Sequence, residues 1–397
     1  MVRFSRFSQF AAGFAAIFLC WLFLAAAPSA AAPLIYAWQG GETGVLQNSL
    51  PAYMLAAGRA AAVHLPVVAT RDNQVIILAT PDLVRSTDVA TIFPARLRPD
   101  GTAASVDFTL AEIRRLYRQA DKTGPADESS LPAVLTTLDE ILAMEKIMVS
   151  RLGQAPALII ELVEPAWHRQ SGHDLSALAL QCLDRQKIAP DDEHIIFMSE
   201  DGAEMQRLAQ DLLPPSGRQH RLLQMIGPEP PSRDENNPSA QPQAPDANEW
   251  AFTQLGLRVI AGYAYGVAIE KNRLVSPRGT PSQDDYLARA KKLGLMVFVY
   301  PVAPDDTIPQ MNTLAPPPAP PPAQPPTEQS TGAPATAPST AAPPVAAPPP
   351  VTPVKASDFF LNTIGADGLF MSPLPPAAMA ADNAVPDKGG GQSQGKK

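Results

Sequence analysis

Residues 36–50 read YAWQGGETGVLQNSL, and this stretch decides the fold class. A short apolar strand ends in a Gly-Gly turn, a polar loop follows, and the helix-like run LPAYMLAAGRAA begins at Leu50. A strand that leads into a glycine-rich polar loop is how α/β proteins build the mouth of a site. The loop carries Trp38, Gln39 and Gln47, none of which exchanges a proton near neutral pH. We therefore expect a site at this loop without acid–base chemistry from these three side chains.

Beyond this loop, apolar runs alternate with segments of helical period. Thr109 and Thr137 are each followed three residues later by a glutamate, so each is expected to begin a helix with a capping box. The alternation favours a parallel sheet with helical crossovers. The expected strands are residues 34–38, 63–69, 75–79, 158–162, 194–198, 222–226, 257–262, 296–302 and 368–371. These nine candidates come close to the eight strands of a closed (β/α)8 barrel of the TIM type, which suits them better than an open sheet.

Two proline-rich stretches interrupt the barrel pattern, residues 227–248 and residues 305–354. Such composition buries too little apolar surface to offset the entropy of ordering, so both are predicted to be disordered or polyproline II, as is a flexible tail at 377–397. Each insertion follows a strand and would emerge on the face of a barrel that carries sites. The second is a candidate docking arm for a protein partner, with a passive surface insertion as the alternative. Replacing residues 305–354 with a short Gly-Ser loop is expected to leave the barrel folded, with the thermal midpoint unchanged within a few degrees.

The first 31 residues have the pattern of a secretory signal peptide. Arg3 and Arg6 precede an apolar run at 10–27, and a stretch of small residues follows. Cleavage after Ala31 would place the protein in the periplasm or outside the cell, with only transient membrane contact through the signal. The alternative is a retained membrane anchor, because the apolar run approaches the length of a bilayer span. Without this segment Cys182 is the only cysteine, so no internal disulfide is expected.

Charge and motifs narrow the function classes. The net charge is −8, and the 31 Lys and Arg residues form no basic stripe, so nucleic acid is not expected as a partner. The sequence has no Gly-x-Ser-x-Gly elbow, no His-Glu-x-x-His motif and no phosphate-binding loop with lysine. His168 and His173 lie close together in sequence but lack a third ligand for a transition metal. A small ligand or a protein partner suits this composition.

Several segments match the scaffold motifs of one family. They are FTLAE at 108–112, LTTLDEIL at 135–142 and GADG at 365–368. Together with the opening strand and loop, they resemble the glycerophosphodiester phosphodiesterase family over about residues 33–376. The resemblance implies a β/α barrel that hydrolyses glycerophosphodiesters with a divalent metal, an activity of lipid metabolism.

The acid–base positions of that family are replaced in this chain. The family's first strand ends in His-Arg-Gly, where this chain has Trp38, Gln39 and a glycine. A later strand of the family ends in His-Asp, where this chain has Ala79 and a threonine. Neither tryptophan nor alanine can transfer a proton. The resemblance therefore implies that no catalytic residue is intact.

The metal positions are replaced as well. The resemblance puts the family's metal carboxylates at Gln47, His64 and Pro66, which offer a neutral oxygen, a nitrogen and no donor. Magnesium and calcium need several oxygen ligands. Glu161 is the one position at which a family carboxylate remains. No metal or other cofactor is therefore expected.

Two functions follow from these replacements. The first is a secreted barrel that no longer hydrolyses phosphodiesters, a pseudoenzyme that binds a small polar or phosphodiester-like ligand or acts as a scaffold. The candidate pocket consists of Trp38, Gln39, Gln47, Asn48, His64 and Glu161. The second is a phosphodiesterase with a rearranged site, in which Mg or Ca is held by Glu161, Glu42 or Asp72. Some of these residues also have structural explanations: Asn48 is expected to cap the helix near Leu50.

Overall fold

The computed structural model describes the chain in seven segments. They are residues 33–41, 45–118, 134–228, 246–275, 280–281, 285–310 and 352–375. The signal segment, the C-terminal tail and Glu42 lie outside these residues. None of the described helices has the length and apolarity of a transmembrane span.

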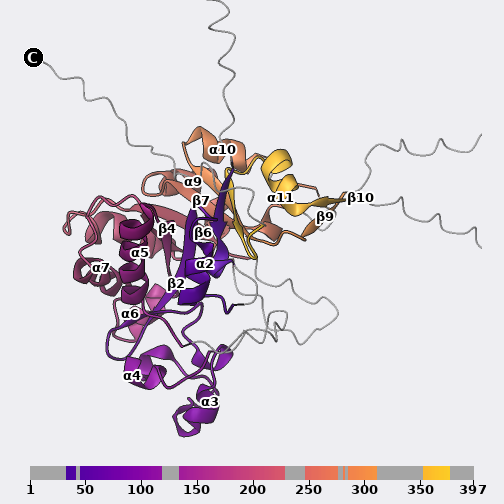
Figure 1. Cartoon of the computed structure of the whole chain (residues 1–397). Helices are drawn as coiled ribbons and strands as arrows, with labels where there is room; N and C mark the ends of the chain where they lie inside the picture. Colours follow the sequence, from indigo (N-terminus) through magenta and orange to yellow (C-terminus); the bar gives the residue numbers. More distant parts are fainter. Residues whose placement is uncertain are drawn as a thin grey trace, which may run out of the picture. The chain divides into compact units, whose positions relative to one another are not determined.

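A closed barrel of parallel strands forms the centre of the described structure (Figure 1). β1 hydrogen-bonds to both β11 and β2, and this double pairing closes the sheet. The barrel strands are β1 Leu34–Ala37, β2 Ala62–Ala69, β4 Ala157–Leu162, β5 Ile195–Ser199, β6 Arg221–Ile226, β7 Gly266–Glu270, β8 Met296–Val302 and β11 Gly368–Met371. The predicted (β/α)8 barrel of the TIM type is confirmed.

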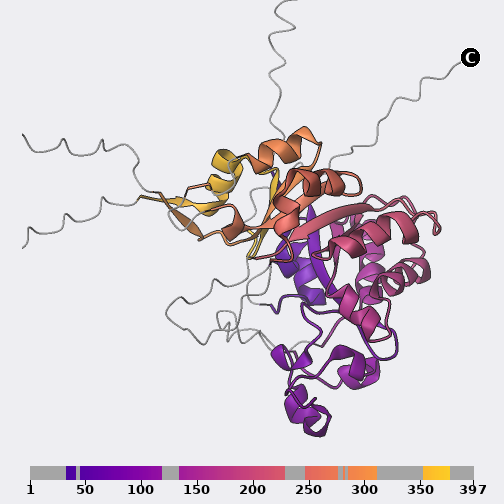
Figure 2. The same ribbon diagram turned by 180° about the vertical axis from the view of Figure 1, so that it is seen from behind.

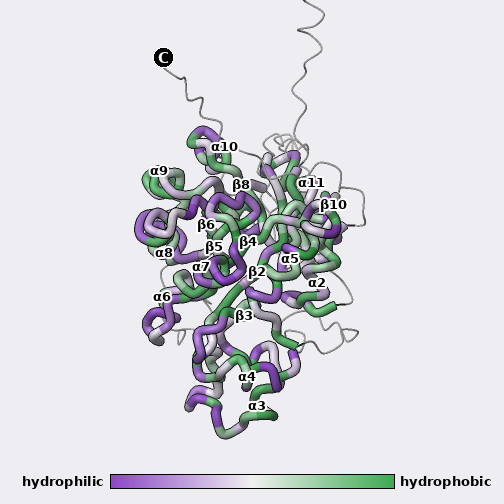
Figure 3. The backbone as a smooth tube through the Cα atoms, turned by 60° about the vertical axis from the view of Figure 1, so that its left-hand side comes forward, coloured by the Kyte–Doolittle hydropathy of each residue, from purple (hydrophilic) through white to green (hydrophobic). Residues whose placement is uncertain are grey.

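Helices cover the outside of the barrel. They are α2 Leu50–Ala56, α5 Leu138–Leu152, α6 Pro165–Gln170, α7 Leu175–Arg185, α8 Gly202–Arg207, α9 Gln254–Ala261, α10 Tyr286–Lys292 and α11 Ala356–Asp358. Hydrophilic residues gather on α6 and α8, whereas β2 is mostly hydrophobic (Figure 3). Two short helices, α3 Val89–Ile92 and α4 Leu110–Ile113, belong to a lobe beside the barrel (Figures 1 and 2). Both predicted capping boxes, at Thr109 and Thr137, are present.

Two of the expected strands have another role. Residues 75–79 contain β3 Val75–Ile77, which pairs antiparallel with β2 and is not a barrel strand. The expected strand at 257–262 is wrong, because these residues lie in and just beyond α9. Leu257 and Ile260, three residues apart, are fully buried, as on one face of a helix. The missing barrel strand is β7.

The inner and outer faces of the strands form separate apolar clusters. The inner cluster contains Tyr36, Phe298 and Phe370, and the Tyr36 and Phe298 rings stack with centroids 4.7 Å apart. The outer cluster lies between the strands and the helices. Because successive residues of a strand point to opposite faces, every second residue of each barrel strand points inward.

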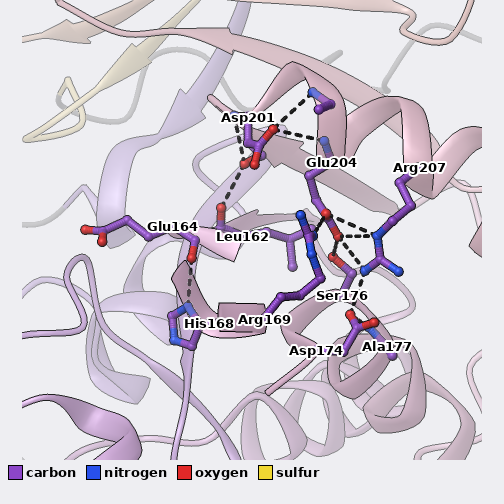
Figure 4. Close-up of polar contacts among 12 residues, drawn as sticks. Leu162, Glu164, His168, Arg169, Asp174, Ser176, Ala177, Asp201, Glu204 and Arg207 are labelled. Atoms are coloured by element: carbon purple, nitrogen blue, oxygen red, sulfur yellow. Dashed lines mark hydrogen bonds and ion pairs between the residues drawn. The ribbon is translucent and has the colours of Figure 1, made fainter. Parts of the chain in front are cut away.

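A buried ion-pair network joins α6, α7 and α8 (Figure 4). The Glu204 side chain is completely buried and bonds to Arg169, Arg207 and the Ser176 hydroxyl. Arg207 also reaches Asp174, with Nη2 2.7 Å from the carboxylate. A buried carboxylate is tolerated only with such partners. The network therefore fixes three outer helices next to the ends of β4 and β5.

The second proline-rich insertion begins and ends in an ordered ribbon. β9 Thr307–Gln310 pairs antiparallel with β10 Thr352–Lys355, and this corrects the predicted disorder of 305–354 at both ends. Ile308 and Val354 pack against the outer core, so the apolar residues of the ribbon order it. Residues 311–351 lie outside the described chain. Of the first insertion, 227–248, the structure describes 227–228 and 246–248.

The loop after β7 holds the roots of both insertions. Lys271 Nζ lies 2.5 Å from Asp306, at the root of the second insertion. Arg273 is buried and donates from both terminal nitrogens, at 2.7 Å, to one oxygen of Asp246 at the root of the first. Two cations two residues apart thus attach both roots to the barrel rim.

The ribbon provides a stability test. Replacing residues 311–351 with a short Gly-Ser loop is expected to leave the thermal midpoint within a few degrees of that of the full chain, because loop-closure entropy depends weakly on length. For the replacement of 305–354, the ordered ribbon corrects the expectation of an unchanged midpoint. This change should lower the midpoint clearly, since it also removes Ile308 and Val354 from the core and Asp306 from Lys271. Thermal denaturation followed by circular dichroism measures both. Equal midpoints for the two variants would contradict a stabilising role of the ribbon.

Candidate functional site

Three glutamates occupy inward positions at the carboxyl ends of barrel strands. Glu161 is paired in register with Met198, and Glu270 with Tyr300. Both partners belong to the inner cluster, so both glutamates point inward. Glu200 follows Met198 by two residues and has the same orientation by strand alternation. The mouth of the barrel is therefore lined by carboxylates from β4, β5 and β7.

An aromatic stack covers the fourth inward group, His64 on β2. The Trp38 ring lies parallel to the imidazole, with centroids 4.1 Å apart and planes 8° apart, and Tyr300 stacks near Trp38 at 4.9 Å. His64 is fully buried, and its Nε2 lies 2.7 Å from Glu161 Oε2. Its Nδ1 has no partner among the described residues. A proton on Nδ1 would be buried without an acceptor, so Nε2–H donates to the Glu161 carboxylate.

The structure brings Trp38, His64 and Glu161 together, while the other loop residues hold the loop itself. Gln39 has a left-handed backbone, and its carbonyl accepts the N–H of Asn48 at 2.8 Å. The Gln47 side chain donates to Ser372 Oγ at 2.8 Å. Arg118 donates to the carbonyls of Gln47 and Asn48. Gln39 and Gln47 therefore contribute to the shape of the rim.

The helix cap predicted at Asn48 is wrong. Ser49 is the N-cap of α2, and its hydroxyl accepts the N–H of Ala52. Asn48 has φ of 56°, a left-handed conformation that asparagine tolerates better than most residues. It is buried, and its Oδ1 has no hydrogen-bond partner within the described chain.

A pocket of about 440 Å³ lies beside Glu161. Its wall contains Trp167 and Ala79, the residue for which the resemblance implies a family histidine. Four carboxylates line it, those of Glu161, Glu164, Glu200 and Asp201. The lining residues described in the structure include no Lys, Arg or His. Pro66 lies next to Glu161 in the register of β2 with β4.

The negative charges of the carboxylates at the barrel mouth repel one another. Burial, and next the charge of Glu161, raise the pKa of Glu200 to about 7. The Glu200 carboxyl lies over Gly227, where a Cβ atom would collide with it. The Glu200 side chain is partly exposed to water, which screens its charge. The pKa shift therefore corresponds to a smaller change in the free energy of unfolding than it would for a fully buried group. Burial also raises the pKa values of Glu164 and Glu270.

The residues at the family's metal positions do not fit a hard divalent ion. Gln47 is bound to Ser372, the His64 nitrogen is bound to Glu161, and Pro66 has no donor. Magnesium and calcium need several converging oxygens. The described residues contain no group of three His, Cys, Asp or Glu side chains that could hold a metal ion.

The carboxylates suggested for a rearranged site do not supply this ligand set. Asp72 is a turn residue, and its Oδ1 accepts from Thr70 Oγ1 at 2.7 Å and from the N–H of Leu110 at 2.9 Å. Glu42 lies outside the described residues. Glu200 and Glu270 are among the site residues that the sequence analysis missed, as are Glu164, Trp167 and Asp201 of the pocket wall. Glu200 lies one residue beyond the end of its strand, and Glu270 belongs to the strand that was misplaced.

His168 is a structural residue. Its Nδ1 lies 3.0 Å from the Glu164 carbonyl (Figure 4). Its Nε2 accepts the N–H of Ala69 at 3.1 Å. Burial lowers the pKa of His168 to about 4. His173 contacts Asn73 instead, with Nδ1 2.8 Å from the amide oxygen. Both nitrogens of His168 are thus occupied, and it is not available as a metal ligand.

Comparison with known proteins gives consistent matches. The model of the glycerophosphoryl diester phosphodiesterase family matches residues 39–315. A glycerophosphodiester phosphodiesterase from Treponema pallidum is 26% identical over 254 residues, which cover 61% of this chain and 71% of that protein. One from Haemophilus influenzae is 28% identical over 169 residues, 40% of this chain and 46% of that protein.

Solved structures show the same likeness at lower identity. A phosphodiesterase from Oleispira antarctica, in complex with the product sn-glycerol-3-phosphate, has 17% identity and a TM-score of 0.43, covering 68% of this chain and 85% of that one. A glycerophosphodiester phosphodiesterase from Agrobacterium tumefaciens has 18% identity and a TM-score of 0.41, covering 69% and 89%.

Because the pKa of Glu200 is raised in the folded protein, replacing its carboxyl with a neutral amide is expected to stabilise the fold at high pH. The folded state holds this proton more tightly than the unfolded state, whose pKa is near 4.5, so the associated stability is present below about pH 4.5 and is lost as the pH rises through about 7. Glu200→Gln is therefore expected to raise the thermal midpoint at pH 8 and to leave it unchanged near pH 4. Glu193→Gln, at an exposed residue paired with Arg221, should give no gain at pH 8. A lower midpoint of Glu200→Gln at pH 8 would show that the charge is stabilising.

Proposed function

Because the chain belongs to the glycerophosphoryl diester phosphodiesterase family, whose model matches residues 39–315, we propose that it is a member without phosphodiester hydrolysis that acts as a binding or scaffolding protein. The observation that carries this proposal is the stack of Trp38 on His64 with His64 bound to Glu161. Glu161, the single carboxylate retained at a family position, is already paired with His64. The positions of the two family histidines hold an indole and a methyl group.

This arrangement supports the proposal because the family's acid–base positions, as the resemblance places them, carry no group that can transfer a proton. A general acid or base must exchange a proton within hydrogen-bonding reach of the reacting atom. Neither Trp38 nor Ala79 has a side chain that exchanges a proton near neutral pH. His64 is fully buried beneath the indole. The donor set also does not fit a metal. What remains is a concave mouth suited to a small polar ligand.

One observation favours a second candidate, a hydrolase with a rearranged site. Glu200 has a pKa of about 7 beside Glu161, so one carboxyl can hold a proton near neutral pH while its neighbour is charged. Carboxyl pairs with separated protonation serve as acid and base in other enzymes. This candidate would use Glu161 and Glu200, with Mg or Ca only if ligands come from residues outside the described chain.

An assay of the purified protein separates the two candidates. Glycerophosphocholine is incubated with the protein in the presence of magnesium, calcium or zinc, and release of glycerol phosphate is measured. We expect no turnover above that of the Glu161→Gln variant, because the acid–base and metal groups are replaced. Turnover that is abolished by both EDTA and Glu161→Gln would contradict the proposal and support the hydrolase.

We also propose that the protein is exported through its first 31 residues, with retention as a membrane anchor as the alternative. N-terminal sequencing of protein from the periplasm or the medium is expected to begin at Ala32. Cytoplasmic protein with Met1 intact would contradict export, and membrane-bound protein with Met1 intact would support the anchor.

The proline-rich residues 311–351 are proposed to bind a protein partner, which the variant without them should fail to retain in a pull-down.

A further inference from the structure

We propose that the pocket beside Glu161 binds a small organic cation, such as an amine or a quaternary ammonium group. The proposal rests on the binding role proposed above and names its ligand class. Three features carry it: a carboxylate oriented by a buried imidazole, negative charge without a cation in the wall, and an indole with apolar neighbours.

The first feature is the fixed orientation of Glu161. His64 is fully buried and donates from Nε2 to Glu161 Oε2, while its Nδ1 has no partner in the described part of the chain. One oxygen of Glu161 is therefore occupied by the protein. The side chain is 14% exposed, and Glu161 is part of the pocket wall. A buried polar group that orients a partly exposed carboxylate is the usual construction of a binding site.

The second feature is uncompensated negative charge. The Asp201 carboxylate accepts the N–H groups of Ala203 and Glu204 at the start of α8. The carboxylates of Glu164 and Glu200 have no hydrogen-bond or ion-pair partner among the described residues, and Arg85 acts on Glu164 only through its charge. The charge of Arg273 acts on Glu200, but Arg273 is buried and held by Asp246. A cation in the pocket would offset the repulsion from Glu161, which adds to the effect of burial in raising the pKa of Glu200.

The third feature is the chemistry of the remaining wall. Trp167 offers an indole, the best aromatic partner for a cation, and the Arg98 guanidinium already lies 5.9 Å from this ring. Val163, Pro165 and Ala79 supply apolar surface for methyl or methylene groups. A metal ion would gain nothing from this apolar wall. An organic cation uses both parts of it.

The same wall disfavours an anion. A phosphodiester would lie against the carboxylates of Glu161, Glu164 and Glu200 without an Arg, Lys or His in the described lining. The phosphate charge and these carboxylates would repel one another. Because the carboxylates are partly buried, salt screens this repulsion only in part. The preferred ligand is therefore of opposite charge to a phosphodiester.

Calorimetric titration of the full-length protein with choline chloride at low ionic strength tests this inference. We expect saturable binding, weakened about tenfold by Glu200→Gln and by Glu161→Gln, because each removes one charge near the ligand. Trp167→Leu should weaken it about two- to fivefold through loss of the cation–π contact. Glu193→Gln removes an equal charge from the surface outside the pocket and should have no effect.

Several results would overturn the proposal. These are no saturable heat from choline, tighter binding of sn-glycerol 3-phosphate than of choline, or an equal loss of affinity in Glu193→Gln and Glu200→Gln. Thermal midpoints identify any variant that is unfolded, and the variants on different elements test the site independently. Failure here would leave the hydrolysis assay unaffected, so the two proposals are judged separately.

Co-sedimentation with phosphatidylcholine vesicles distinguishes a lipid headgroup from a free cation as the source of the ligand.

Discussion

Closure of the sheet between β1 and β2 determines which side chains meet at the mouth. The pairing of Tyr36 with Ala62 fixes the register of the two strands. His64 lies two residues beyond Ala62 in β2, and Trp38 follows directly after the end of β1, so this register brings the two rings together. A slip of one residue would separate the indole from the imidazole. The stack and the hydrogen bond to Glu161 thus depend on the backbone pairing of β1 with β2.

Polar contacts outside the barrel keep this mouth in place. Glu204 and its two arginines fix α6, α7 and α8 behind the pocket wall, and Glu164 and Trp167 lie at the start and within α6. On the other side, Lys271 and Arg273 attach the roots of both insertions to the rim. The barrel therefore keeps its mouth geometry through two different sets of charge pairs, one centred on the buried Glu204 and one at the roots of the insertions.

Much of this fold could be predicted from the sequence, because its determinants are local. The capping boxes at Thr109 and Thr137 and most barrel strands follow from spacing within a few residues. Residues 257–262 were misassigned because a short apolar run fits a strand and a buried helix face equally well. The site was only partly predictable. Trp38, His64 and Glu161 were expected in the pocket, but their stacking and the approach of Glu200 depend on contacts between distant strands.

The ring stack limits how the mouth can change during evolution. Trp38 lies against His64, and His64 supports Glu161, so each side chain is part of the environment of the next. A carboxylate at position 64 would face an indole and a second carboxylate, and a smaller residue at position 38 would expose a buried imidazole. Each single substitution is therefore unfavourable while its neighbours remain, although several made together can be tolerated. Such interdependence, or epistasis, makes the present chemistry of the mouth difficult to reverse by successive single mutations.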